Sequence, residues 1–302
     1  MSIQNFFINR FLKSRRAKSL QLAPEHRLRQ GRKFLNRDYG KPHPQIDVRA
    51  DRLAGVPVEW VQPKALLNDA QAPICVYFHG GGYIAGSLNS HRDMATTLAH
   101  KAQVRMLMVD YRLAPENPFP AAHQDAMAVY RALLAQGVNA EQLLLGGDSA
   151  GGNLALATAQ AVRDANLPLP RGLVLFSPWL DLTHQAKSIT SNSDSDAMLH
   201  RQLLDDALAM YAPSVPASDP RISPLLGNLE RLPPCLTVVS QSEILRDDSL
   251  RLHDQLQALG NDSTCLPWKH TPHAFPVMAR LLPEARDALR QTADFMARVL
   301  RR

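Results

Sequence analysis

The chain has 302 residues, 45% of them apolar, which is enough to bury a large core in one α/β domain with insertions. Its three cysteines, Cys75, Cys235 and Cys265, are widely spaced in or beside apolar runs. This spacing argues against a disulfide framework and predicts core residues of a protein in a reducing, cytoplasmic compartment. The net charge of +6 is uneven, because residues 1 to 41 hold eleven Lys and Arg against two acids.

The basic N-terminal segment also contains apolar residues, namely Phe6, Phe7, Ile8, Phe11 and Leu12. Their spacing predicts an amphipathic helix whose apolar face packs on its own domain. We expect no nucleic-acid partner, and the sequence leaves open a weak contact with a membrane surface and a homodimer. Because no apolar stretch is long enough, we expect neither a secretory signal nor a transmembrane helix.

After this segment, short apolar runs alternate with helical patterns. The first two runs flank Gly55 and predict an edge hairpin. Predicted strands span 46–53, 56–61, 74–78, 104–109, 143–146, 173–176, 236–239 and 263–268, and predicted helices span 91–101, 121–136, 150–164, 199–211, 246–259 and 283–300. This alternation predicts an α/β fold with a mostly parallel sheet of about eight strands, covered by helices on both faces. Such a sheet binds ligands beyond the carboxyl ends of its strands.

The alternation of strands and helices lapses between about residues 181 and 231. A polar stretch at 188–196 precedes one helical pattern and a proline-rich return to the sheet. An insertion at this point of the fold would lie above the carboxyl ends of the strands. We therefore predict that it forms part of a lid over the site.

A serine lies between glycines where one strand pattern gives way to a helical one. The segment Gly147-Asp148-Ser149-Ala150-Gly151 fits Gly-x-Ser-x-Gly, which packs a serine into a strained turn between a strand and a helix. A serine hydroxyl is a poor nucleophile at neutral pH unless a base and an orienting carboxylate assist it. The sequence therefore predicts Ser149 as a nucleophile with two partners.

The general base should be a histidine late in the chain. Enzymes that carry a nucleophilic serine in such a strand-to-helix turn have their catalytic residues in the chain order serine, acid, histidine. Of the eleven histidines, His253, His270 and His273 lie late enough. His253 falls inside a helical pattern, whereas the other two lie in the loop after the last predicted strand. We favour His273, which is further from the strand and is held by Pro272. No cluster of ligand spacing accompanies this pair of histidines, so we predict no metal site.

Three acids are candidates for the orienting carboxylate. Glu243 lies just past the strand predicted at 236–239, where a loop carboxylate could reach an imidazole. Asp247 and Asp248 fall in the first turn of the next helix, where acids are common because they complement the helix dipole. We favour Glu243 and keep Asp247 as the alternative.

Acyl transfer also needs donors for the negative charge that develops on the carbonyl oxygen. The strand predicted at 74–78 ends in the loop His79-Gly80-Gly81-Gly82. Glycines leave their N–H groups unobstructed, so this loop can aim two of them at the oxygen. The amide of Ala150 is predicted as a third donor of the oxyanion hole.

These segments resemble those of the hormone-sensitive-lipase-like esterases, the bacterial family IV branch of the α/β-hydrolases. The resemblance spans about residues 74 to 275 and rests on five segments in order. They are His79-Gly80-Gly81-Gly82-Tyr83, Asp110-Tyr111-Arg112-Leu113-Ala114-Pro115-Glu116, Gly147-Asp148-Ser149-Ala150-Gly151-Gly152, Ser177-Pro178-Trp179 and His273-Ala274-Phe275. The commonest family pattern has aspartate at the acid position, where this chain has Glu243 and keeps a carboxylate.

The resemblance implies a carboxylesterase that hydrolyses short- to medium-chain esters through an acyl-enzyme, without a cofactor. It also implies one α/β-hydrolase domain over residues 1–302, with a helical cap formed by about residues 1–45 and the insertion. The same scaffold could hydrolyse amides, carbamates or formyl groups, or serve as an inactive ligand-binding protein. The retained serine, histidine and carboxylate argue against the inactive alternative.

Overall fold

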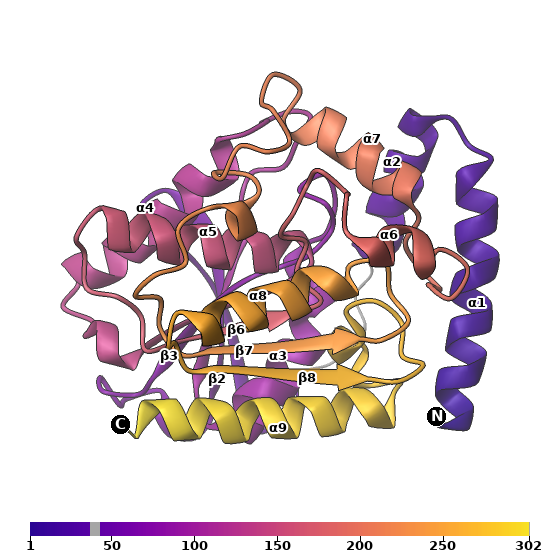
Figure 1. The fold of residues 1–302 in the computed structure, drawn as a ribbon. Helices are drawn as coiled ribbons and strands as arrows, with labels where there is room; N and C mark the ends of the chain where they lie inside the picture. Colours follow the sequence, from indigo (N-terminus) through magenta and orange to yellow (C-terminus); the bar gives the residue numbers. More distant parts are fainter. Residues whose placement is uncertain (37–42, 302) are drawn as a thin grey trace.

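The computed structural model describes residues 1–36 and 43–301 and contains an eight-stranded sheet with helices on both faces (Figure 1). Arg37, Asp38 and Lys41 of the basic segment lie outside the described residues. The strands follow the order β1-β2-β4-β3-β5-β6-β7-β8 across the sheet. They are β1 (Ile46–Leu53), β2 (Val56–Pro63), β3 (Ile74–Phe78), β4 (Arg105–Val109), β5 (Leu143–Asp148), β6 (Gly172–Phe176), β7 (Cys235–Ser240) and β8 (Ser263–Trp268).

The first two strands form the predicted antiparallel hairpin, and β2 also runs antiparallel to β4. From β4 to β8 all neighbours are parallel. The predicted α/β-hydrolase fold with a mostly parallel sheet is therefore confirmed. Parallel pairing brings the carboxyl ends of these strands to one edge, where loops from several strands can meet.

Two layers of helices bury the two faces of the sheet, because side chains alternate along each strand. Val76 and Phe78 point into the core on one face, whereas Cys75 and Tyr77 point into the core on the other. The first face packs against α4 (Ala121–Ala135), α5 (Ala150–Asp164) and α8 (Arg246–Ala258), and the second packs against α3 (Leu88–Ala102) and α9 (Pro283–Leu300). Cys75 and Cys235 are free and buried, as the sequence predicted, and Cys265 is half-buried.

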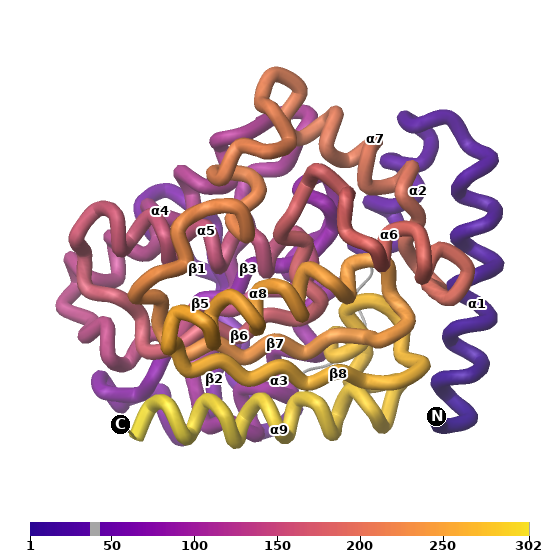
Figure 2. Tube along the Cα trace, viewed as in Figure 1, coloured from indigo at the N-terminus to yellow at the C-terminus, as the bar shows by residue number. Residues whose placement is uncertain are grey.

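Four helices lie outside these two layers, at the side of the molecule toward which the arrowheads of β7 and β8 point (Figures 1 and 2). They are α1 (Ile3–Leu20), α2 (Pro24–Leu35), α6 (Lys187–Ser191) and α7 (Arg201–Tyr211). Short 3₁₀ turns occur at Lys64–Leu66, Ala140–Gln142, Pro224–Leu226 and Phe275–Met278. None of the helices in the described ranges combines the length and apolarity that crossing a bilayer requires.

Helix limits differ from the predicted ones where side chains cap them. Helix α3 begins at Leu88 rather than at the predicted residue 91, because Ser87 and Ser90 form a reciprocal capping box. Within the insertion, α7 begins at Arg201 because the ring of His200 accepts a hydrogen bond from the Gln202 N–H. The short helix α6 lies in the stretch that was predicted only as polar.

The predicted packing of the N-terminal helix is wrong for its three phenylalanines. Phe6, Phe7 and Phe11 keep 50%, 62% and 54% of their surface exposed. Leu12 is buried, but Asn5 is buried more completely. The helix forms as predicted, yet it turns much of its apolar surface away from the domain.

Candidate active site

Ser149 occupies the turn between β5 and α5, with a positive φ of 53° and ψ of −120°. This strained conformation is held because its N–H donates to the Phe176 carbonyl over 2.9 Å. A Cβ on Gly147 would lie 2.2 Å from the Gly151 carbonyl oxygen, and one on Gly151 would lie 1.9 Å from the Phe78 carbonyl oxygen. The two flanking glycines are therefore a steric requirement of this turn, which leaves Ser149 half-buried at the carboxyl edge of the sheet.

Glu243 and His273 meet although they follow different strands. His273, in the loop after β8, donates its Nδ1–H to Oε2 of Glu243, in the loop after β7, over 2.5 Å. The other carboxylate oxygen of Glu243 accepts the Ser240 N–H over 3.0 Å, which fixes its orientation. Both side chains are buried. Burial disfavours a charged imidazole, but the attraction of Glu243, together with that of Asp196 and Asp148, outweighs it, so the pKa of His273 is raised above its usual 6.5.

The alternative residues lie in other surroundings. Asp247 accepts the Ser188 N–H over 2.9 Å and pairs with Arg246 over 2.7 Å. The ring of His270 is exposed, and that of His253 contacts the Ser263 hydroxyl over 2.9 Å. Of the candidate acids and histidines, the structure thus pairs Glu243 with His273.

The glycine loop after β3 holds two kinds of N–H group. The N–H of Gly80 donates to Oδ1 of Asp148 over 3.0 Å, so the expectation that Gly80 supplies an oxyanion donor needs correction: its donor is already engaged. Gly81 and Gly82 have positive φ values of 124° and 65°. Within the described part of the chain, the N–H groups of Gly81, Gly82 and Ala150 donate to no protein acceptor. Three donors therefore stay available at this edge.

A buried ionic network lies beneath this loop, and sequence reasoning missed it. Oδ1 of Asp148 accepts from the Tyr77 hydroxyl over 3.0 Å and lies 3.0 Å from Nε2 of His91. Burial alone would raise the pKa of Asp148, but the nearby His91 lowers it; in turn, burial would lower the pKa of His91, and Asp148 raises it. The only signals in the sequence were an acid within the glycine-serine segment and a histidine at the start of the helix predicted at 91–101, after the glycine loop.

The loop after β4 also supports the glycine loop. The hydroxyl of Tyr111 donates to the His79 carbonyl over 2.6 Å. Arg32 of α2 reaches the same region, donating to the carbonyls of Ile84 and Ala114 and to both carboxylate oxygens of Glu116 over 2.7 Å. These contacts tie the N-terminal region to the two loops.

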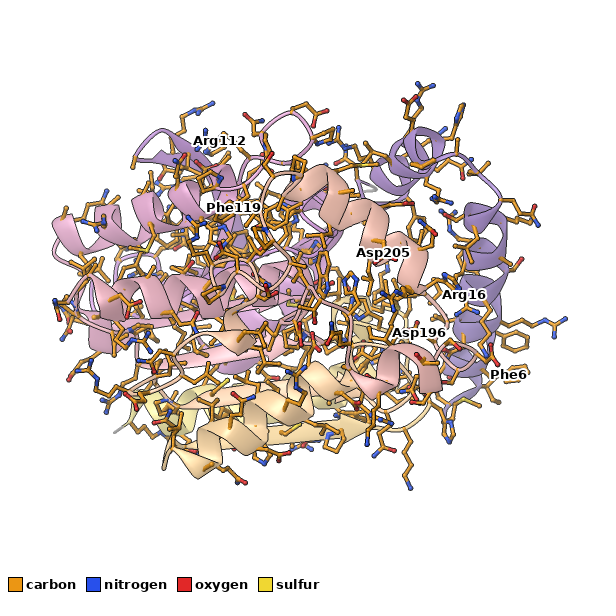
Figure 3. The ribbon with its side chains drawn as sticks, turned by 45° about the horizontal axis from the view of Figure 1, so that its top comes forward. Phe6, Arg16, Arg112, Phe119, Asp196 and Asp205 are labelled. Atoms are coloured by element: carbon orange, nitrogen blue, oxygen red, sulfur yellow. The ribbon has the colours of Figure 1, made fainter. Side chains whose placement is uncertain are left out.

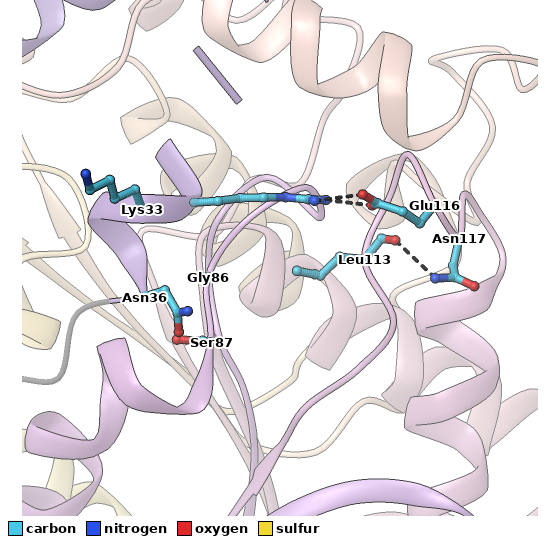
Figure 4. A pocket seen from close by; sticks show the side chains of 8 residues that line it. Lys33, Asn36, Gly86, Ser87, Leu113, Glu116 and Asn117 are labelled. Carbon is cyan, nitrogen blue, oxygen red and sulfur yellow. Dashed lines mark hydrogen bonds and ion pairs between the residues drawn. The ribbon is translucent and has the colours of Figure 1, made fainter. Parts of the chain in front are cut away.

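A cavity of about 490 Å³ lies beside Arg32 (Figure 4). Its lining comes from α2 and the loops after β3 and β4 and includes the Arg32–Glu116 ion pair. The hydrogen bonds from Arg32 hold the pKa of Glu116 down at about 2. None of the residues predicted for catalysis lines this cavity, so it belongs to the junction of α2 with the sheet domain.

The fold and this arrangement define the class of protein: an α/β-hydrolase with a serine at a strand-to-helix turn. The family profile described as the alpha/beta hydrolase fold matches residues 75–277. An esterase of Acinetobacter venetianus is 36% identical over 254 residues, which cover 84% of this chain and 82% of that protein. An acetyl-hydrolase of Streptomyces hygroscopicus is 37% identical over 238 residues, covering 79% and 78%.

Solved structures give the same result over nearly the whole chain. A crystal structure of an esterase from the bacterial hormone-sensitive lipase family superposes with a TM-score of 0.90 at 33% identity, covering 99% of both chains. A mutant of the esterase E40 gives the same TM-score, identity and coverage. The chain therefore belongs to the α/β-hydrolase family, in its branch of hormone-sensitive-lipase-like esterases. It is a carboxylic ester hydrolase.

Proposed function

We propose that this esterase cleaves carboxylic esters with short to medium acyl chains through an acyl-enzyme on Ser149. The observation that carries the proposal is the buried pair of Glu243 and His273, which lies in the loops of neighbouring strands at the carboxyl edge of the sheet, where Ser149 also lies. An imidazole with one nitrogen bound to a carboxylate presents its other nitrogen as a base. This division of roles needs no cofactor.

In the proposed first step, Nε2 of His273 takes the proton of the Ser149 hydroxyl as the oxygen attacks the ester carbonyl. Glu243 holds the ring in the tautomer with a proton on Nδ1 and stabilises the imidazolium that forms. The imidazolium then gives its proton to the leaving alcohol. In the second step, water is activated by the same histidine and releases the acid from Ser149.

The tetrahedral intermediate carries its negative charge on the former carbonyl oxygen. We assign its stabilisation to the N–H groups of Gly81, Gly82 and Ala150, which are free of protein acceptors among the described residues. Each such donor contributes on the order of 3 kcal/mol in other hydrolases. Gly80 takes a positioning role instead, because its N–H anchors the loop on Asp148.

A helical cap is proposed over this site, formed by about residues 1–45 and 181–231 of a single domain spanning 1–302. Its two parts contact one another, since Arg27 of α2 pairs with Asp206 of α7 over 2.5 Å. The ring of Tyr211 in α7 stacks on Tyr83, beside the glycine loop, with 3.9 Å between centroids. Substituents of the ester would then be selected by cap side chains.

The nucleophile is tested by replacing Ser149 with alanine. Purified protein should hydrolyse p-nitrophenyl butyrate and octanoate and should be labelled by a fluorophosphonate, and Ser149→Ala should abolish both. Unlabelled wild-type protein would indicate an inactive ligand-binding relative, and full turnover by the variant would refute the assignment.

The orienting acid is tested by comparing Glu243→Gln with Asp247→Asn. The loss of the carboxylate partner costs a factor of about 10⁴ in kcat in a related serine-histidine-acid triad. We therefore expect Glu243→Gln to lower kcat by about 10³ or more, whereas Asp247→Asn changes it far less. The reverse order of losses would transfer the role to Asp247.

A further inference from the structure

The N-terminal helix α1 is held on the protein by polar contacts. Asn5, completely buried, and Asn9 each donate a side-chain N–H to the His270 carbonyl over 3.0 Å. About two turns after Asn9, Arg16 donates to the carbonyls of Ser193 and Asp196 over 2.7 and 2.6 Å. Figure 3 shows Arg16 directed toward Asp196, and Phe6 directed away from the molecule. The inner face of this helix is therefore largely polar.

The outer face of α1 is apolar, the reverse of an ordinary surface helix. Ile3, Phe6, Phe7 and Phe11 are 76%, 50%, 62% and 54% exposed. At helical spacing, Ile3, Phe7 and Phe11 follow one another at intervals of four residues along one side, and Phe6 packs edge-on against Phe7. Met1, 68% exposed, extends the patch at the chain start. A contiguous exposed apolar patch of this kind indicates a surface that binds a membrane or another protein.

Charge decides what this face binds. Helix α1 contains five cations and no Asp or Glu, and Arg10, Lys13 and Lys18 are exposed beside the apolar side chains. Aromatic side chains flanked by Lys and Arg are the composition of a helix that lies in the headgroup region of an anionic bilayer. A second copy of the chain, meeting this one through the same face, would oppose these cations with identical ones.

We propose that the outer face of α1, formed by Met1, Ile3, Phe6, Phe7 and Phe11 with the flanking cations, docks the enzyme on an anionic lipid surface. The phenylalanines enter the boundary between headgroups and acyl chains, while Arg10 and Lys18 contact the lipid phosphates. The polar inner face stays on the protein, so docking does not require the helix to leave it.

The docked helix lies next to the candidate active site. Asn5 and Asn9 hold the carbonyl of His270, three residues before His273 in the same loop. Arg16 holds the segment of Asp196, whose carboxylate in turn accepts the N–H of Ile244, the residue after Glu243. A membrane contact at α1 would therefore place the site close to esters dissolved in the lipid.

The test is co-sedimentation of the full-length protein with vesicles of phosphatidylglycerol or of phosphatidylcholine. We expect strong binding to the anionic vesicles that weakens with salt, and weak binding to the zwitterionic ones. The triple variant Phe6→Ser, Phe7→Ser, Phe11→Ser should bind anionic vesicles at least about ten-fold more weakly. The double variant Arg10→Gln, Lys18→Gln should lose about five-fold per cation. It should lose little on the zwitterionic vesicles.

The matched control replaces three exposed leucines outside α1, with Leu67→Ser, Leu259→Ser and Leu281→Ser, and should bind like the wild type. Turnover of soluble p-nitrophenyl butyrate by every variant shows that the fold is intact. Equal vesicle binding by the wild type and the phenylalanine variant would overturn the proposal. So would a wild-type dimer in analytical ultracentrifugation that this variant converts to a monomer without any vesicle binding, because the face would then join two copies.

Discussion

Asp148 anchors the glycine loop at residues 79–82. Replacing Asp148 with asparagine tests how much this anchoring contributes to catalysis and to stability. A single oxygen, Oδ1, contacts the N–H of Gly80, the hydroxyl of Tyr77 and Nε2 of His91, each over 3.0 Å. Asparagine keeps an acceptor oxygen at this place and nearly the same volume. The substitution therefore removes the negative charge while the three partners can still be satisfied.

The cost follows mainly from the contact with His91, in which both partners lose their charge and an ion pair becomes a neutral hydrogen bond. Hydrogen bonds to charged groups contribute about 1.5–3 kcal/mol, and neutral ones about 0.5–1.5 kcal/mol. The free energy of unfolding should thus fall by about 1–2 kcal/mol at neutral pH, because His91 can lose its proton when its counter-ion is removed. For a chain of this size, that corresponds to a fall in Tm of roughly 2–3 °C.

The pH dependence of the difference has a defined sign. The folded pKa of His91 is raised: burial opposes its charge, but Asp148 outweighs burial. Its contribution to stability is therefore present below the usual pKa and is lost as pH rises through the raised value. The folded pKa of Asp148 is lowered, so its contribution is present above 3.8 and is lost as pH falls through the lowered value. The free energy of unfolding of the variant should differ most from that of the wild type between the lowered pKa of Asp148 and the raised pKa of His91.

Steady-state kinetics and thermal melts measure the two effects together. A shift of the loop by a fraction of an ångström misplaces the Gly81 and Gly82 donors, so we expect kcat to fall at least about ten-fold with KM nearly unchanged. Asp248→Asn is the control for kcat, because this buried carboxylate accepts the N–H groups of Leu180 and Asp181, away from the glycine loop. If Asp148→Asn kept the wild-type kcat and melted normally at pH 7, the network would have no positioning role.

Three further outcomes follow from single groups. Because burial raises the pKa of Asp248 from 3.8 to about 7, its ionisation destabilises the fold by an amount that grows between these two pH values, and Asp248→Asn should exceed the melting temperature of the wild type by more at pH 8.5 than at pH 5. Gly151→Ala would place a Cβ 1.9 Å from a carbonyl oxygen of β3 and should yield no folded protein, whereas Gly31→Ala, with open space around it, should express normally. Because the pKa of His273 is raised, kcat/KM should decline on the acid side from above pH 6.5, and Glu243→Gln should move that limb to lower pH.

The fold could be predicted because its strands are easily recognised in the sequence. Buried parallel strands are apolar on both faces, so runs such as Ile74–Phe78 stand out from the helical patterns between them. The serine turn was predictable for a steric reason, since Gly147 and Gly151 leave no room for any side chain. Limits of elements were less accurate wherever a cap such as Ser87 decided them.

The residues missed at the site act through contacts that no spacing reveals. His91 reaches Asp148 from a helix on one face of the sheet, 57 positions away in the chain, and Tyr77 reaches it from a neighbouring strand. The same carboxylate also accepts the N–H of Gly80. The glycine run alone therefore could not show which N–H groups are free to bind an oxyanion and which one anchors the loop. The pairing of Glu243 with His273 also depends on β7 and β8 being neighbours in the sheet. The positions of the acidic residues in the sequence do not show which strands are neighbours.

The N-terminal helix shows the limit of reading amphipathicity from sequence. A periodic pattern states that a helix has an apolar side, but the direction of that side depends on what the rest of the fold offers. Here the surface beneath α1 presents backbone carbonyls of His270, Ser193 and Asp196, which bind Asn5 and Arg16. Amide and guanidinium donors satisfy those acceptors and phenylalanines do not, so the polar side turns inward and the apolar side is left for another partner.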